Sequence, residues 1–173
     1  MKKLVVTFIA VVGLVSCAEQ DKIVFVDRTK LLEEYQGRKD IQTKHDDKME
    51  KLAFKKDSIS KVLQMDGQEF DKKYKNLKQP TAAAQADYEA LVTKQKNWSE
   101  ILQRREYEIN TETQKEVDTL LKTVKKFVNQ FGKDKKYTYI LGANDAGSVM
   151  YGDETRDVTE DVLKAINDDY AKN

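Results

Sequence analysis

Few residues in this sequence could do chemistry. Cys17 is the only cysteine and His45 the only histidine, so one chain can form neither a disulfide nor a metal site built on thiolates or paired histidines. The serine and threonine hydroxyls have no histidine partner other than His45, which argues against a nucleophilic triad. No glycine-rich loop that could cradle a phosphate is present. The sequence therefore predicts that the protein is not an enzyme and binds no cofactor.

Five acidic residues near the C-terminus raise the possibility of a calcium site. The cluster consists of Asp153, Glu154, Asp157, Glu160 and Asp161. Its spacing does not match an EF-hand loop, and capping of a helix explains the last three residues more simply. We therefore expect no metal ion here.

The N-terminus carries a signal of the lipoprotein type. Lys2 and Lys3 precede an apolar run over residues 4–15, which is shorter than the ~20 residues that span a bilayer. A basic start and small residues before a cleavage point are typical of a secretory leader. The segment resembles the signal of bacterial lipoproteins, which implies cleavage before Cys17 and acylation of that cysteine. An ordinary cysteine within a signal peptide is the alternative.

This resemblance divides the N-terminal region into a signal peptide over residues 1–17, with Cys17 retained and lipidated, and a short tether over residues 18–22. Each tether residue reaches at most ~3.5 Å. The body would therefore lie close to the membrane that holds the anchor.

The composition favours an extended helical chain. Charged residues make up 35% of the sequence, against one proline and seven glycines, which is typical of long solvated helices. Removal of the leader takes two of the 31 basic residues and none of the 30 acidic ones, leaving 29 against 30. This balance predicts no strong electrostatic partner, and we expect no binding of nucleic acid.

Three short runs of β-branched and aromatic residues predict a small sheet. They cover residues 23–26, 137–141 and 148–151. Turn-forming residues at 143–147 predict a hairpin between the second and third strands. The expected fold class is α+β, mostly α, with a body of about three strands and a C-terminal helix.

Between the first and second runs, the sequence predicts a long antiparallel helical hairpin. The stretch is dense in residues that favour helix, and the only proline, Pro80, predicts the bend. Pro80 lies near residue 82, the midpoint between Asp27 and Tyr137. Two arms of about 50 residues would each extend roughly 75 Å. The expected helical arm covers about residues 38–131, and the body covers residues 23–37 and 132–173.

Apolar residues recur at steps of three, four and seven in both arms, as in a coiled-coil seam. They are Ile41, Met49, Leu52, Ile59, Leu63, Phe70, Tyr74 and Leu77 in the first arm, and Tyr88, Leu91, Trp98, Leu102, Ile109, Val117, Leu120, Val124, Phe127 and Phe131 in the second. His45 also falls on the seam, where a polar packing role is expected.

The seam is dense near the predicted sheet but thin further out. Polar residues occupy outer seam positions at Lys56, Asp66, Gln95, Arg105 and Thr113. Gly67 adds a weak point worth about 1 kcal/mol relative to alanine. Because thin packing opposes local opening only weakly, we expect the outer arms to be mobile.

A C-terminal helix is predicted over residues 157–170, because Asp157 followed by Glu160 suits a helix N-terminus. The small body is a poor core for long arms, which favours association of several chains. The residues expected in the body core, some of them at subunit contacts, are Ile23, Phe25, Tyr139, Leu141, Met150, Val162 and Ile166.

Three stretches of the chain resemble the Skp/OmpH family of periplasmic chaperones: KIVFVDRTKLLEEY at 22–35, YTYILG at 137–142 and VMYGDETRDVTEDVLKAIN at 149–167. The resemblance implies a homotrimer whose helical arms project from a β-body and enclose a cavity for unfolded outer-membrane proteins. It also implies a location in the periplasm. The chain departs from the familiar members in its lipoprotein signal and its near-neutral charge.

Two functions remain open from the sequence. An ATP-independent holdase, lipid-anchored to a membrane and expected at the outer membrane, would bind unfolded clients through flexible arms without a deep specific pocket. A structural or adaptor coiled coil would instead bind one fixed protein partner. For the holdase, the candidate client or lipid contacts near the bend are Phe70, Lys72, Lys73, Tyr74, Lys75 and Lys78. A merely solvated helix face is the alternative for this group.

Overall fold

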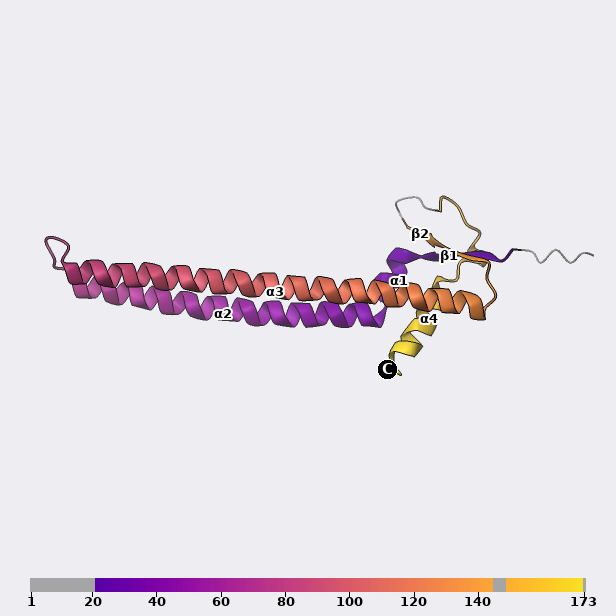
Figure 1. Ribbon diagram of the computed structural model, residues 1–173, viewed down its shortest axis with the longest axis horizontal. Helices are drawn as coiled ribbons and strands as arrows, with labels where there is room; N and C mark the ends of the chain where they lie inside the picture. The colour runs from indigo at the N-terminus through magenta and orange to yellow at the C-terminus, as the bar shows by residue number, and fades with distance from the viewer. Residues whose placement is uncertain (1–20, 145–148, 173) are drawn as a thin grey trace, which may run out of the picture.

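The protein consists of a small body and one long helical arm (Figure 1). The computed structural model describes residues 21–144 and 149–172, so Cys17 and the predicted signal peptide lie outside the described residues. The elements follow in the order β1 (Ile23–Asp27), α1 (Arg28–Glu34), α2 (Gln36–Tyr74), α3 (Ala82–Asp134), β2 (Tyr139–Ala143), a 3-10 helix η1 (Glu154–Arg156) and α4 (Thr159–Tyr170).

The sheet has two strands, and they run parallel. Ile23 pairs with Tyr139, and the register continues to Asp27 opposite Ala143. Parallel strands need a long crossover connection, and here the whole arm is that connection. The predicted first strand is confirmed, and the second begins two residues later than expected.

The predicted third strand is wrong for its described residues, because 149–151 form no strand. The free edge of β1 is occupied instead by a later segment. Asp157 forms a parallel bridge with Phe25, and the Val158 backbone N–H donates to the Phe25 carbonyl at 3.0 Å. Directly after this contact the chain enters α4.

The core of the body lies on one face of β1. Val24 and Val26 are buried against the C-terminal helix, whose Val162 and Ile166 are also buried. Successive strand residues point to opposite faces, so Ile23 points away from this core and remains exposed. Within one chain, the core is therefore formed by the face of β1 with Val24 and Val26, and not by the predicted Ile23.

Two antiparallel helices form the arm, α2 with 39 residues and α3 with 53. They extend about 58 and 80 Å at ~1.5 Å per residue. The chain turns over residues 75–81, where Pro80 predicts the bend. Thr81 then caps α3, since its hydroxyl accepts from the Ala84 backbone N–H at 3.2 Å.

The seam between α2 and α3 alternates apolar layers with ion pairs. Leu52, Ile59 and Ile109 are buried along it, and near the body Leu120, Val124 and Phe131 join the main core. The inter-helix pairs are Lys48 with Glu112, Lys56 with Glu106, Lys73 with Asp87, Lys94 with Asp66, and Lys44 with both Glu112 and Glu116. Two of the predicted polar seam residues, Lys56 and Asp66, thus find partners in the other helix.

The last turns of α4 hold the base of the arm. The Asn167 side-chain oxygen accepts from the Gln36 backbone N–H at 2.8 Å, which satisfies one of the open donors at the start of α2. The Tyr170 hydroxyl donates to Asp40 at 2.7 Å, and its ring meets Tyr35 edge-on with centroids 5.6 Å apart. The arm therefore leaves the body in a direction that α4 helps to set.

Two glycines of α2 have opposite surroundings, which gives a matched test of the arm. A Cβ added at Gly67 would meet nothing within 4 Å, whereas one at Gly37 would lie 2.8 Å from Tyr35 Cζ. We expect Gly67→Ala to stabilise the outer arm by about 0.5–1 kcal/mol. Hydrogen exchange of peptides covering residues 60–75 should slow accordingly.

The control is Gly37→Ala, which should destabilise the base of the arm because the Tyr35 ring must move. If Gly67→Ala left exchange in the outer arm unchanged or faster, the thin seam would not be what limits the stability of this region.

Candidate functional site

The arm exposes large apolar side chains on surfaces that face neither the seam nor the body. Phe54 is 75% exposed, Tyr107 71% and Met65 67%. They lie on long helices in which the neighbouring seam positions, such as Leu52 and Ile109, are buried. Further exposed apolar residues on the arm are Val62, Leu77, Tyr88, Val92, Ile101 and Leu121.

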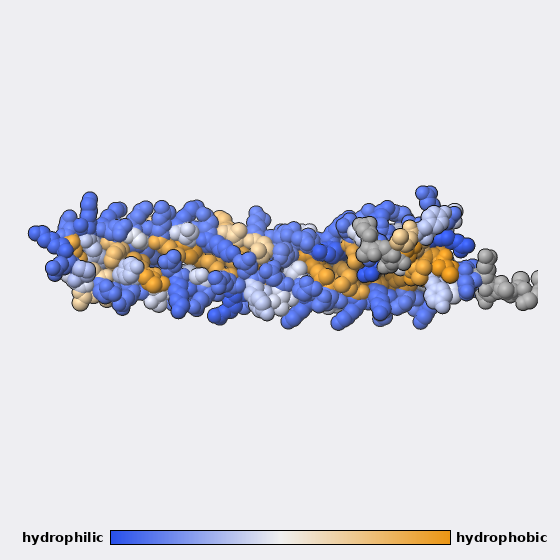
Figure 2. Space-filling view, turned by 90° about the horizontal axis from the view of Figure 1, so that it is seen from above, coloured by the Kyte–Doolittle hydropathy of each residue, from blue (hydrophilic) through white to orange (hydrophobic). Residues whose placement is uncertain are grey.

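These apolar side chains are distributed rather than gathered in one pocket. Figure 2 shows apolar surface in two stretches on one face, over the outer part of the arm and over the body, bordered by hydrophilic side chains. A flexible or unfolded chain could contact several such positions at once, each contributing modest burial. Leu77 and Tyr88 are predicted on the seam but remain exposed. The others are apolar residues off the seam period, and this was the signal in the sequence that could have identified them.

The six residues predicted at the arm tip separate into two groups. Phe70 and Tyr74 are half-buried in the tip, with ring centroids 4.9 Å apart. Lys73 forms an ion pair with Asp87 of α3. The remaining three are exposed and form no ion pair within the described part of the chain; they are Lys72, Lys75 and Lys78. Only this second group presents its charge fully to solvent.

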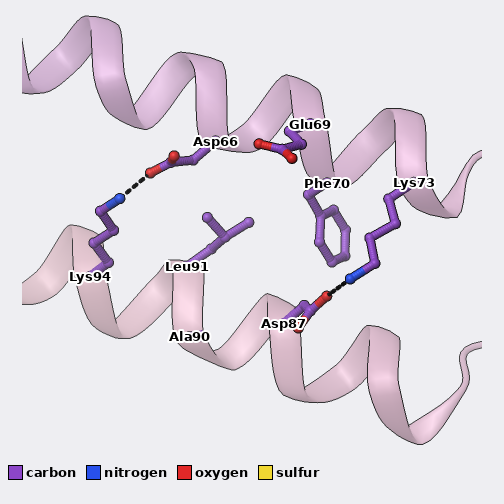
Figure 3. Close-up of a pocket in the computed structure, with 8 residues that line it drawn as sticks. All are labelled: Asp66, Glu69, Phe70, Lys73, Asp87, Ala90, Leu91 and Lys94. Atoms are coloured by element: carbon purple, nitrogen blue, oxygen red, sulfur yellow. Dashed lines mark hydrogen bonds and ion pairs between the residues drawn. The ribbon is translucent and has the colours of Figure 1, made fainter.

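Asp87 of α3 organises the tip (Figure 3). Its carboxylate accepts from the Lys73 ammonium at 2.7 Å and from the Tyr74 hydroxyl at 2.5 Å. The bond from Lys73, followed by that from Tyr74, lowers the pKa of the Asp87 carboxyl below its ordinary value of 3.8. The same contact raises the pKa of Lys73 above 10.5. At neutral pH both groups are therefore charged and joined.

An open groove of about 300 Å³ runs between the helices beside this contact. Figure 3 shows Phe70 and Leu91 pointing into the space between α2 and α3, with the Lys94–Asp66 pair at the far end from Lys73 and Asp87. The groove mixes apolar walls with charged ends. It can accommodate a side chain of a bound peptide, but it does not enclose a small molecule.

The described residues offer no candidate metal centre. No group of three possible metal ligands occurs within 21–144 and 149–172. Over the same residues, every buried polar side-chain atom has a hydrogen-bond partner. None of the helices in this part of the chain is long and apolar enough to cross a membrane.

The outer face of the sheet is apolar and exposed. Of the seven residues predicted in the body core, Val162 and Ile166 are buried, Phe25 is half-buried and Ile23, Tyr139, Leu141 and Met150 are exposed. Those four residues lie outside the core of one chain, because they belong to the opposite face of the strands or to the segment that follows them. Their assignment to subunit contacts stays a prediction.

The protein is thus a long helical hairpin on a small body, with exposed apolar side chains and open grooves along the arm. The family model described as outer membrane protein (OmpH-like) matches residues 22–166, and the chain belongs to this family. Membership of this family supports a periplasmic chaperone as the kind of protein.

A solved structure shares the fold. A candidate OmpH-like outer membrane chaperone from Caulobacter crescentus superposes with a TM-score of 0.75, at 14% sequence identity, covering 86% of this chain and 85% of that one. A search of curated proteins finds no significant match.

Replacement of Asp87 by asparagine tests the organisation of the tip. Because the folded-state pKa of Asp87 lies below its unfolded value, its contact with Lys73 and Tyr74 stabilises the tip at neutral pH. That contribution is lost as the pH falls below 3.8 through the folded pKa. We expect Asp87→Asn to accelerate hydrogen exchange of residues 70–90 at neutral pH, after correction for intrinsic rates, and to have little effect in acid, where the wild-type carboxyl is protonated.

Asp57→Asn is a suitable control, because its partner Lys61 lies in the same helix. An Asp87→Asn effect of equal size at both pH values would show that the carboxylate charge does not hold the tip.

Proposed function

We propose that the protein is an ATP-independent holdase, which binds unfolded outer-membrane or envelope proteins and prevents their aggregation. The observation that carries the proposal is the set of outward apolar side chains on the arm, led by Phe54, Met65 and Tyr107. Apolar side chains scattered singly are common on protein surfaces, so these residues support the proposal through the many weak contacts that they offer along one extended arm. Family membership supports the same function.

The arrangement of these side chains suits clients of many sequences. Single exposed apolar residues separated by charged ones give many weak contacts and no fixed recognition geometry. The Lys72, Lys75 and Lys78 side chains at the tip add positive charge for acidic segments of a client. No nucleotide is needed, because release requires only that the client fold or bind more tightly elsewhere.

The proposed assembly is a homotrimer joined through the bodies. Ile23, Tyr139 and Leu141 alternate with inward residues on the paired strands and form an apolar outer face. Such a face on a small body is typical of a surface covered by another copy. The arms of the copies would then surround the space in which a client is held.

Acylation of Cys17 and a periplasm-facing site at the outer membrane complete the proposal. They are supported by the lipoprotein-type sequence that ends at Cys17. An anchored holdase would concentrate its binding surfaces close to the membrane where its clients insert.

Light scattering of an unfolded outer-membrane β-barrel protein, diluted from urea, tests the holdase activity. We expect the protein to suppress aggregation at about three chains per client, as a trimer should. The triple variant Phe54→Gln, Met65→Gln and Tyr107→Gln should lose most of this suppression while keeping its helical content, because none of the three side chains supports the seam.

A matched control replaces three exposed polar residues of the same helices, in the variant Lys51→Gln, Lys55→Gln and Arg104→Gln. It should suppress aggregation as the wild type does. If the folded wild-type protein left scattering unchanged, the holdase would be rejected in favour of an adaptor with one fixed partner.

The trimer is tested separately by the variant Leu141→Asp. Leu141 is exposed in one chain, so a charge there should leave the protomer folded but prevent burial of the outer face. Multi-angle light scattering should show a fall from the trimer mass to that of one chain. Retention of the wild-type mass would contradict the assignment of this face to subunit contacts.

A further inference from the structure

The last turns of α3 present a concentrated positive surface. Lys122, Lys125, Lys126 and Lys133 are all exposed and, with Asn129 and Gln130, line one open groove. We name these four lysines the basic face. Their spacing of three, four and seven residues places them on one side of the helix, away from the buried Leu120, Val124 and Phe131.

The basic face differs from the rest of this nearly neutral chain. Residues 119–133 contain four lysines and no aspartate or glutamate, in a sequence with 30 acidic residues. Lysines on the arm seam pair with carboxylates of the other helix, for example Lys48 with Glu112 at 2.7 Å. Among the described residues, no lysine of the basic face forms an ion pair. The positive charge is therefore left uncompensated by the chain itself.

The neighbouring groove between α3 and α4 is mixed in charge. Its charged lining residues are Asp134, Asp161, Asp168, Lys135 and Lys164, and Lys164 pairs with Asp168 at 3.2 Å. Charge of a single sign is thus confined to the basic face. A surface of this kind favours docking of an anionic surface from one direction.

Stabilisation of the helix end does not account for the basic face. Interaction with the helix dipole is confined to the last turn, where α3 has Lys133. Lys122, Lys125 and Lys126 lie about two to three turns earlier. Their shared orientation needs another explanation.

The basic face lies at the end of the molecule from which the chain leads toward Cys17. α3 ends where β1 begins (Figure 1), and the Thr138 backbone N–H donates to the Lys22 carbonyl at 3.0 Å. Five peptide units join Lys22 to Cys17, a reach of at most about 18 Å. From Lys133 to Lys122 the face extends about 16 Å along the helix. An acyl anchor at Cys17 would therefore hold these lysines within reach of lipid headgroups.

We propose that the basic face docks on anionic phospholipid headgroups of the membrane that holds the anchor, and so fixes how the body is turned relative to that membrane. This rests on the acylation of Cys17 stated under the proposed function. Several lysines near an anionic membrane act together, each raising the affinity for that membrane about fivefold. An acyl chain supplies attachment but no rotational orientation, whereas a one-sided row of charges supplies orientation.

Amine labelling of the full acylated chain tests the proposal. The protein is reconstituted in vesicles of equal parts phosphatidylethanolamine and phosphatidylglycerol, or in vesicles of phosphatidylcholine alone, and exposed to a water-soluble acetylating reagent. Labelling rates of individual lysines are then read by mass spectrometry. We expect the basic face to react at least about fivefold more slowly on the anionic vesicles. Salt near 1 M should abolish the difference, because the Debye length is then ~3 Å.

The arm-tip residues Lys72, Lys75 and Lys78 provide the internal control and should react equally on both vesicles. Equal labelling of the basic face on both vesicles would overturn the proposal. Slow labelling on both vesicles would also overturn it, because it would indicate a contact between protein chains. Slowing only after addition of an unfolded acidic protein would overturn it too, because it would indicate a client surface. A chain whose mass lacks the acyl group would count against the anchor, while client aggregation is measured independently of both.

Discussion

The parallel pairing of β1 with β2 is the constraint on which the rest of the structure depends. Because a parallel pair cannot be closed by a tight turn, the chain must travel away and return before Tyr139 can lie beside Ile23. The connection takes the form of the α2–α3 hairpin, so both ends of the arm are fixed to the body. The Phe25–Asp157 bridge on the other edge of β1 then brings α4 against the core and against the base of the arm.

The two helices of the arm are held together at intervals, while other apolar side chains of the arm remain exposed. Apolar contacts such as Ile59 and Ile109 hold the helices together at intervals, and ion pairs occupy the positions between them. Exposed pairs of this kind each contribute about 1 kcal/mol or less, so they keep the helices in register without making the arm rigid. Apolar residues outside the seam, including Phe54 and Tyr107, remain available for binding.

The sequence predicted the helical hairpin and its bend well, because period and a single proline are local signals. It could not predict which face of β1 is buried, because residues 23–26 are all apolar and show no alternation. The third strand failed for a similar reason: β-propensity at 149–151 does not reveal that Asp157 takes the free edge of β1. At the candidate site, the sequence predicts lysines near the bend, and their role in binding stays a prediction. The binding of Lys73 and Tyr74 to Asp87 could not be predicted, because it depends on the register between two helices.

The central claim is that unfolded envelope proteins bind along the outward surfaces of the arm. It is tested most directly by placing a photoreactive phenylalanine analogue at position 107 or at the buried seam position 109, and irradiating each protein with an unfolded outer-membrane β-barrel protein. The account predicts strong cross-linking to the client from position 107 and little from position 109, with loss of both signals once the client has folded. Equal cross-linking from both positions, or none from position 107, would contradict it.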